Sequence, residues 1–97
     1  MICEQYNEAP PLAHYIAVVH QQGDSAFGVH FPDVPGCFSA ADDRNDILTN
    51  ASEALALHLE GEALPEARSL DAVRADDDVA RDLAEGAFLI AVPLQLP

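Results

Sequence analysis

Two apolar runs near the two ends of the chain restrict its fold more than any other feature. They span residues 12–20 and 87–94, and neither alternates between apolar and polar positions. Their short length and β-branched residues favour strands over helices, and apolar side chains at successive positions indicate burial on both faces. We therefore expect two strands that are each covered on both sides, one early and one late in the chain.

Two further strands are predicted between these runs. Residues 25–31 place alternate apolar side chains on one face: Phe27, Val29 and Phe31. The turn at residues 21–24 predicts a β-hairpin between this strand and the first run. Residues 32–36 then interrupt the pattern, because proline cannot donate a ladder hydrogen bond, and residues 37–40 predict a short third strand.

The second half of the chain predicts a long and a short helix. Asp42 or Asp43 is suited to cap the long helix, Asp46 adds negative charge to its first turn, and Gly61 ends it. Residues recur along this helix at helical spacing: Ile47, Leu48, Ala51, Ala54, Leu55, His58 and Leu59. After a polar stretch with Ser69 as a candidate cap, the run Asp76, Asp77 and Asp78 predicts a short helix that ends at Gly86.

The predicted elements follow the order strand, strand, strand, helix, short helix, strand. This order predicts an α+β fold with a four-stranded mixed sheet and the main helix on one face. Because the last strand follows a helix, we expect a crossover that places it parallel to the first strand. One amphipathic helix cannot cover both faces of residues 12–20 and 87–94, and the short segment 70–84 has too little apolar content to cover more than part of the second face. The spare apolar surface therefore predicts a homodimer or a higher oligomer.

The charge of the chain limits its partners. It has 17 acidic residues against four arginines and no lysine, which gives a net charge of −13 over 97 residues. Binding to nucleic acid depends first on basic residues that neutralise phosphates, so this segment is not expected to bind DNA or RNA directly. Its field instead favours association with a basic protein.

The composition also indicates a cellular compartment. Cys3 and Cys37 are far apart and form no paired motif, and the first residues lack the basic and apolar regions of a signal peptide. No apolar run approaches the roughly 20 residues of a membrane helix. We expect a cytoplasmic protein with reduced thiols and no membrane partner.

The loop between the second and third strands carries a motif: Phe31, Pro32, Asp33, Val34, Pro35, Gly36 and Cys37. With the flanking strands and helix, it resembles the HicB-like antitoxin family from about Tyr15 to Pro97. The resemblance implies a partial, degenerate RNase H-like fold in an antitoxin of a type II toxin–antitoxin pair. Such an antitoxin neutralises a small basic HicA-like, mRNA-cleaving toxin by occluding its active site.

The resemblance also implies a domain organisation. Residues 1–11 are expected to form a flexible lead-in, and residues 12–97 the antitoxin domain. Family members usually continue into a DNA-binding domain, which is expected to be absent from this chain. Acidic residues are the candidates to face the toxin: Asp33, Asp42, Asp43, Asp46 and Glu53.

No catalytic, cofactor-binding or metal-binding residue is expected. A two-metal nuclease needs converging carboxylates, and residues 12–20 and 87–94 contain none. His14 and His20 lie about 20 Å apart along an extended strand and cannot share a metal. His30 is placed to approach one of them, but structural histidines are the expectation. Cys37 lacks a cationic neighbour in sequence and is expected to be a buried packing residue.

Two other functions remain open at this point. One is an orphan HicB-like oligomeric binding domain without a toxin, and the other is a weak metal-dependent RNase H-like nuclease. The placement of the carboxylates argues against the nuclease. The expected function is therefore that of a binding protein, not an enzyme.

Overall fold

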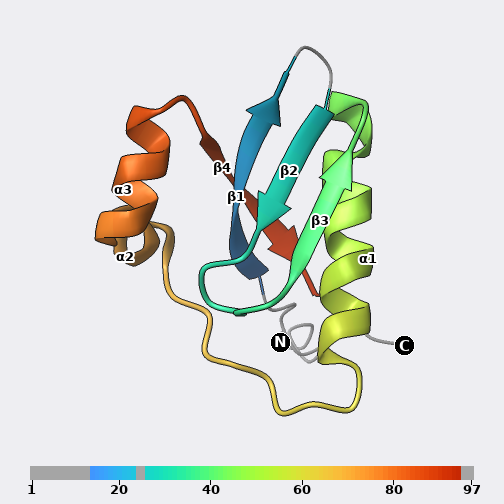
Figure 1. Cartoon of the computed structure of the whole chain (residues 1–97). Helices are drawn as coiled ribbons and strands as arrows, with labels where there is room; N and C mark the ends of the chain where they lie inside the picture. Colours follow the sequence, from blue (N-terminus) through green and yellow to red (C-terminus); the bar gives the residue numbers. More distant parts are fainter. Residues whose placement is uncertain (1–13, 24–25, 95–97) are drawn as a thin grey trace, which may run out of the picture.

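The computed structural model describes residues 14–23 and 26–94, so the lead-in expected at residues 1–11 lies outside the described part. A sheet lies between two helical layers, with α1 on one face and α2 and α3 on the other (Figure 1). The elements in chain order are β1 (His14–Gln22), β2 (Ala26–His30), β3 (Phe38–Ala41), the 3₁₀ helix η2 (Arg44–Asp46), α1 (Ile47–Leu59), α2 (Leu70–Arg74), α3 (Asp77–Ala84) and β4 (Phe88–Pro93). Within the described residues, no helix has the length and apolar character needed to cross a membrane.

The sheet has the order β3-β2-β1-β4, and every neighbouring pair is antiparallel. The predicted α+β class, the four strands and the first hairpin are confirmed. The prediction of a mixed sheet is wrong, because β4 pairs antiparallel with β1 and sets Val19 opposite Phe88. Between β3 and β4 the chain runs along the sheet twice, once in α1 and once in the segment that contains α2 and α3 (Figure 1). The second passage reverses the direction in which the chain enters β4, which therefore starts beside the end of β1.

The larger core lies between the sheet and α1. Tyr15, Ala17 and Val19 point to this side, because side chains alternate along a strand. The buried residues of α1 recur every four positions: Ile47, Ala51, Leu55 and Leu59. The same core includes Phe31 and Cys37 from the loop between β2 and β3. The main helix therefore holds both the sheet and the motif loop in place.

The opposite face of β1 is covered by the second helical layer. Ile16 and Val18 form a second buried cluster with Val73 of α2 and Val79 of α3. The expectation that this face stays open for a second subunit is therefore wrong. Residues 70–84 contain few apolar side chains, but Val73 and Val79 are fully buried and Leu83 is partly buried against them, so a short amphipathic segment completes the layer.

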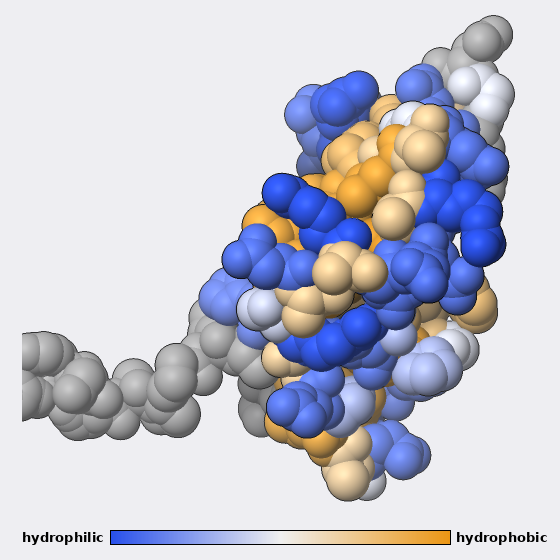
Figure 2. Space-filling view, turned by 90° about the vertical axis from the view of Figure 1, so that its left-hand side faces the viewer, coloured by the Kyte–Doolittle hydropathy of each residue, from blue (hydrophilic) through white to orange (hydrophobic). Residues whose placement is uncertain are grey.

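The last strand is less buried than its apolar run predicted. Phe88, Leu89 and Ile90 are only half-buried, because β4 is an edge of the described sheet. Figure 2 shows the side of the molecule that carries α2 and α3, where apolar surface remains visible between hydrophilic residues. Self-association stays a prediction. Among the described residues, the large apolar side chains that are exposed lie outside this strand, at Phe38, Leu48, Leu57, Leu64 and Leu70.

Several predicted helix boundaries are confirmed. The Ser69 hydroxyl accepts a hydrogen bond from the Ala72 N–H and caps α2, and the Asp76 carboxylate caps α3. Asp43 caps η2, through which the chain enters α1, instead of capping α1 itself. Gly61, just beyond α1, has a φ of +76°, a value that glycine adopts without strain.

Candidate functional site

The motif loop between β2 and β3 consists of two consecutive tight turns. The N–H of Val34 donates to the carbonyl of Phe31, and the N–H of Cys37 donates to the carbonyl of Val34, both at 3.1 Å. Each third residue therefore points inward, and Phe31, Val34 and Cys37 are all buried in the α1 core. Gly36 makes the second turn possible with a φ of +87°. The spacing of the motif thus has a structural explanation.

Asp33 is used inside the molecule. Its side chain is only 6% exposed, and it accepts hydrogen bonds from the backbone N–H of Arg68 at 2.8 Å and from the Arg68 guanidinium. The same guanidinium reaches the Asp76 carboxylate at 3.3 Å, and its hydrogen bond to Asp33 raises the pKa of Arg68. Asp33 therefore joins the motif loop to residues 60–69 and to the start of α3, and the expectation that it faces a toxin loses its support.

A second contact fixes the segment between α1 and α2. The Tyr15 hydroxyl donates a hydrogen bond to the carbonyl of Pro65 at 2.7 Å, and the ring is buried. Burial, followed by the negative charge of Asp33, raises the pKa of the Tyr15 phenol, which stays protonated as this hydrogen bond requires. Together with Arg68, this contact holds residues 60–69 against the sheet despite their lack of helix or strand.

Cys37 packs as expected. It is 2% exposed, and burial raises the pKa of its thiol, so the reactive thiolate is disfavoured. This confirms its role as a buried packing residue of the loop.

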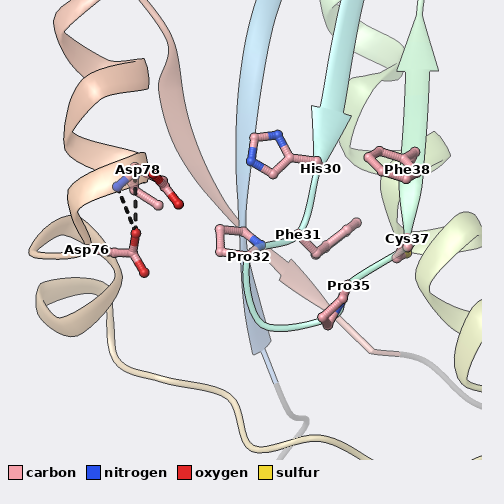
Figure 3. Close-up of a pocket in the computed structure, with 10 residues that line it drawn as sticks. His30, Phe31, Pro32, Pro35, Cys37, Phe38, Asp76 and Asp78 are labelled. Carbon is pink, nitrogen blue, oxygen red and sulfur yellow. Dashed lines mark hydrogen bonds between the residues drawn. The ribbon is translucent and has the colours of Figure 1, made fainter.

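A groove of about 270 Å³ lies between the motif loop and the start of α3 (Figure 3). Phe38, which is 70% exposed, lies on its β3 side, and Asp76 and Asp78 lie on its α3 side. The Asp76 carboxylate accepts hydrogen bonds from the backbone, and the Asp78 carboxylate pairs with Arg81 at 3.3 Å. Phe38 is therefore the large exposed apolar side chain of the groove, and both carboxylates on its α3 side have partners within the chain.

The remaining candidate toxin-facing residues all lie at the surface. Asp42, Asp43 and Asp46 are exposed in the connection from β3 to α1, and Glu53 is exposed two turns further along the helix. These three aspartates are neighbours in the chain, whereas Asp33 belongs to the motif loop and its side chain contacts Arg68. Arg44, in the same connection, lies over the rings of Phe27 and Phe88 at 5.5 and 5.8 Å from their centroids.

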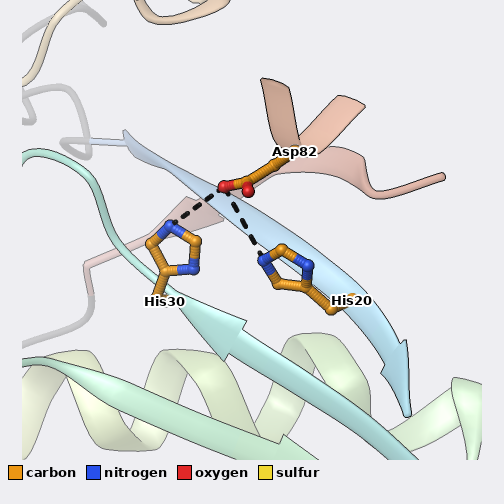
Figure 4. Close-up of side chains that lie close together, drawn as sticks. All are labelled: His20, His30 and Asp82. Atoms are coloured by element: carbon orange, nitrogen blue, oxygen red, sulfur yellow. Dashed lines mark ion pairs between the residues drawn. The ribbon is translucent and has the colours of Figure 1, made fainter. Parts of the chain in front are cut away.

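His20 and His30 meet on the face of the sheet that α3 covers (Figure 4). Their rings stack with centroids 5.3 Å apart, which confirms that His30 approaches a histidine of the first strand. Asp82 of α3 points between them, with its Oδ2 at 3.8 Å from His20 Nε2 and 3.9 Å from His30 Nε2. Burial first, and then the charge of His20, lowers the pKa of His30 despite the opposing effect of Asp82.

Sequence reasoning missed Asp82 as a member of this cluster. Asp82 lies 52 positions after His30. The residues around it do not determine how its helix is oriented on the sheet. The available signal was the amphipathic pattern of α3, in which Val79 faces the sheet and Asp82 follows one turn later.

Comparisons of the sequence and of the structure with known proteins indicate the same family. Residues 15–92 match the family model described as HicB-like antitoxin of bacterial toxin–antitoxin systems. A chain of the solved HicA3 and HicB3 toxin–antitoxin complex is 31% identical, with a TM-score of 0.65 over 88% of this chain and 99% of that one. The solved antitoxin HicB3 is 32% identical, with a TM-score of 0.67 over 86% of this chain and 62% of that one.

Two further relatives extend the comparison. The solved antitoxin HicB of Burkholderia pseudomallei is 26% identical, with a TM-score of 0.68 over 84% of this chain and 62% of that one. An uncharacterized 14.9 kDa protein of Haemophilus phage HP1 is 40% identical over 53 residues, which are 50% of this chain and 40% of that curated relative. The family model covers both helical layers and all four strands apart from their outermost residues, so the chain belongs to the HicB-like antitoxin family.

Proposed function

We propose that this chain is the antitoxin of a type II toxin–antitoxin pair and neutralises a HicA-like, mRNA-cleaving toxin by direct binding that occludes the toxin's active site. The observation that carries the proposal is its similarity, over 88% of its length, to a chain of a HicA3 and HicB3 toxin–antitoxin complex. The family match over residues 15–92 supports the same role.

The proposed activity is binding without catalysis. Strands β1 and β4 contain no Asp or Glu, so the middle of the sheet supplies no carboxylate for a two-metal nuclease. Near the motif loop, Asp33 and Asp76 are engaged with Arg68 and with backbone N–H groups. These carboxylates stabilise the fold, so the proposed function depends on binding through the protein surface.

The acidic connection from β3 to α1 is the surface that we propose for attracting the toxin. A toxin that binds RNA needs a positive surface, and residues 42–46 present the exposed Asp42, Asp43 and Asp46 against the single positive charge of Arg44. Such a cluster increases the rate of encounter more than the strength of the final contact. Exposed charges are screened by salt, so the effect is greatest at low ionic strength.

The rate of association with the toxin encoded in the adjacent reading frame tests this surface. Replacing Asp42 and Asp46 with asparagine is expected to slow association roughly two- to tenfold at low salt, with little change in dissociation. Asp43 is left intact because it caps η2. The control removes two charges on the other layer, Asp71→Asn with Glu85→Gln, and both of these residues are exposed.

The outcomes of this experiment distinguish an error in the proposed steering surface from an error in the proposed antitoxin role. Equal slowing by the two double variants would remove the β3–α1 connection as the steering surface while leaving the antitoxin role intact. Failure of the unaltered chain to bind the toxin at micromolar concentration would contradict the antitoxin role itself and favour an orphan binding domain.

Direct DNA binding by this chain is expected to be absent. The four arginines are each near acidic residues, and a net charge of −13 repels phosphates. A gel shift with the upstream region of its own operon, run at low salt, should leave the DNA unshifted at micromolar protein. A sequence-specific shift by residues 1–97 alone would show that the charge argument is wrong.

A further inference from the structure

We propose that His20, His30 and Asp82 form a binding site for Zn²⁺ or a chemically similar divalent transition metal, which fastens α3 to the sheet. Within the described residues, this is the one group of three metal-ligating side chains whose ligand atoms all lie within 4.8 Å of one another. The site goes beyond the proposed function and does not depend on a toxin.

The sheet register explains why the two histidines meet. His30 of β2 lies opposite Val18 of β1, and His20 follows two positions later, on the same face. Diagonal neighbours of this kind on paired strands are within reach of long side chains. Both rings therefore project from the sheet toward α3, where Asp82 completes the group from a third element (Figure 4).

The three groups do not satisfy one another by hydrogen bonding. The distances of 3.8 and 3.9 Å from the Asp82 carboxylate to the two Nε2 atoms exceed hydrogen-bonding range. The stacked rings also bring two imidazoles side by side, an arrangement that repels a second proton. A cation between the three ligand atoms would contact all of them at once.

The donor set selects the kind of metal. Two imidazole nitrogens and one carboxylate oxygen suit Zn²⁺ and its transition-metal neighbours, whereas Mg²⁺ and Ca²⁺ prefer oxygen ligands. Tetrahedral Zn²⁺ with bonds of about 2.0–2.1 Å needs ligand atoms about 3.4 Å apart. The Asp82 oxygen, at 3.8 and 3.9 Å from the two Nε2 atoms, therefore has to approach each of them by roughly half an ångström. The two imidazole nitrogens, which lie within 4.8 Å of each other, also have to move together. The fourth position is left for water.

The position of the cluster makes it accessible to a metal ion from solvent and places it where a bound ion would stabilise the fold. The side chains of His20, His30 and Asp82 are 34%, 33% and 24% exposed, so an ion reaches them from solvent without unfolding. The second core cluster that holds α2 and α3 is small, with Val73 and Val79 as its buried helical residues. A bound metal would link α3 to strands β1 and β2. Because it would bind the folded chain and not the unfolded one, it would raise the stability of the fold.

Titration of the full chain with Zn²⁺, followed by calorimetry and thermal unfolding, tests the site. One ion should bind per chain and raise the Tm, whereas Mg²⁺ should leave the Tm unchanged. His30→Gln and Asp82→Asn should each weaken Zn²⁺ binding at least about tenfold. His58→Gln, which alters an exposed histidine of α1, is the matched control and should bind as the unaltered chain does.

Co²⁺ provides a measurement on the unaltered chain that does not depend on how the variants fold. Four-coordinate Co²⁺ with nitrogen and oxygen ligands should give visible absorption bands without the charge-transfer band of a thiolate. A thiolate band, no saturable Zn²⁺ binding, or equal affinity in His30→Gln, Asp82→Asn and the unaltered chain would each overturn the proposal.

Discussion

Replacing Leu55 with alanine is expected to lower the free energy of unfolding by about 3 kcal/mol or more. Leu55 is fully buried at the centre of α1, in the cluster that joins the sheet to the motif loop. Removing its side chain costs transfer free energy and leaves a cavity that a helix pinned at Ile47 and Leu59 cannot close. Because small domains are stable by only about 5–15 kcal/mol, this is a large part of the total. Urea unfolding measures the change.

Leu57→Ala is the control on the same helix. Leu57 is 73% exposed, so its truncation should change the free energy of unfolding by less than about 0.5 kcal/mol. If the two variants were equally destabilised, the face that α1 presents to the sheet would be assigned incorrectly.

Asp33→Ala should be the next most damaging change, with a loss of about 2–3 kcal/mol in the free energy of unfolding. The alanine would leave the backbone N–H of Arg68 without its acceptor and the guanidinium without its main partner. Since Arg68 also contacts Asp76, the motif loop, residues 60–69 and the start of α3 would all loosen together. Protection of these backbone amides from hydrogen exchange should fall in parallel.

Two substitutions sharpen this prediction. Asp33→Asn keeps an oxygen acceptor for the Arg68 N–H and should lose less stability than Asp33→Ala. Asp42→Ala removes an exposed carboxylate from the neighbouring connection and should lose less than about 0.5 kcal/mol. An Asp33→Ala variant as stable as Asp42→Ala would mean that Asp33 has no structural role and is free to meet a partner.

Local signals in the sequence were enough to predict most of the elements. The apolar runs located β1 and β4, and the Asp76 cap located α3. Ser69 was recognised as a candidate cap, but the short helix α2 that follows it was not predicted. The motif loop was also placed correctly between β2 and β3, because its prolines and glycine forbid a continuous strand. These features depend on neighbouring residues, so they can be read without the tertiary structure.

Relations between distant elements could not be predicted in the same way. The direction of β4 depends on how often the chain traverses the sheet, which the few apolar residues of α2 and α3 left ambiguous. Asp33 was a candidate to face the toxin because it is acidic, whereas its partner Arg68 is 35 positions away in the chain. For the same reason, the proximity of Asp82 to His20 and His30 could not be predicted, since these side chains meet only when α3 packs over β1.

Cleavage of RNA by the toxin from the adjacent reading frame, measured while this chain is titrated in, tests the central claim most directly. The account predicts that cleavage falls in proportion to the chain added and is lost once the chain is equimolar or in slight excess, and that the chain alone leaves the RNA intact. Full cleavage at a large excess of the chain, or metal-dependent cleavage by the chain itself, would contradict it.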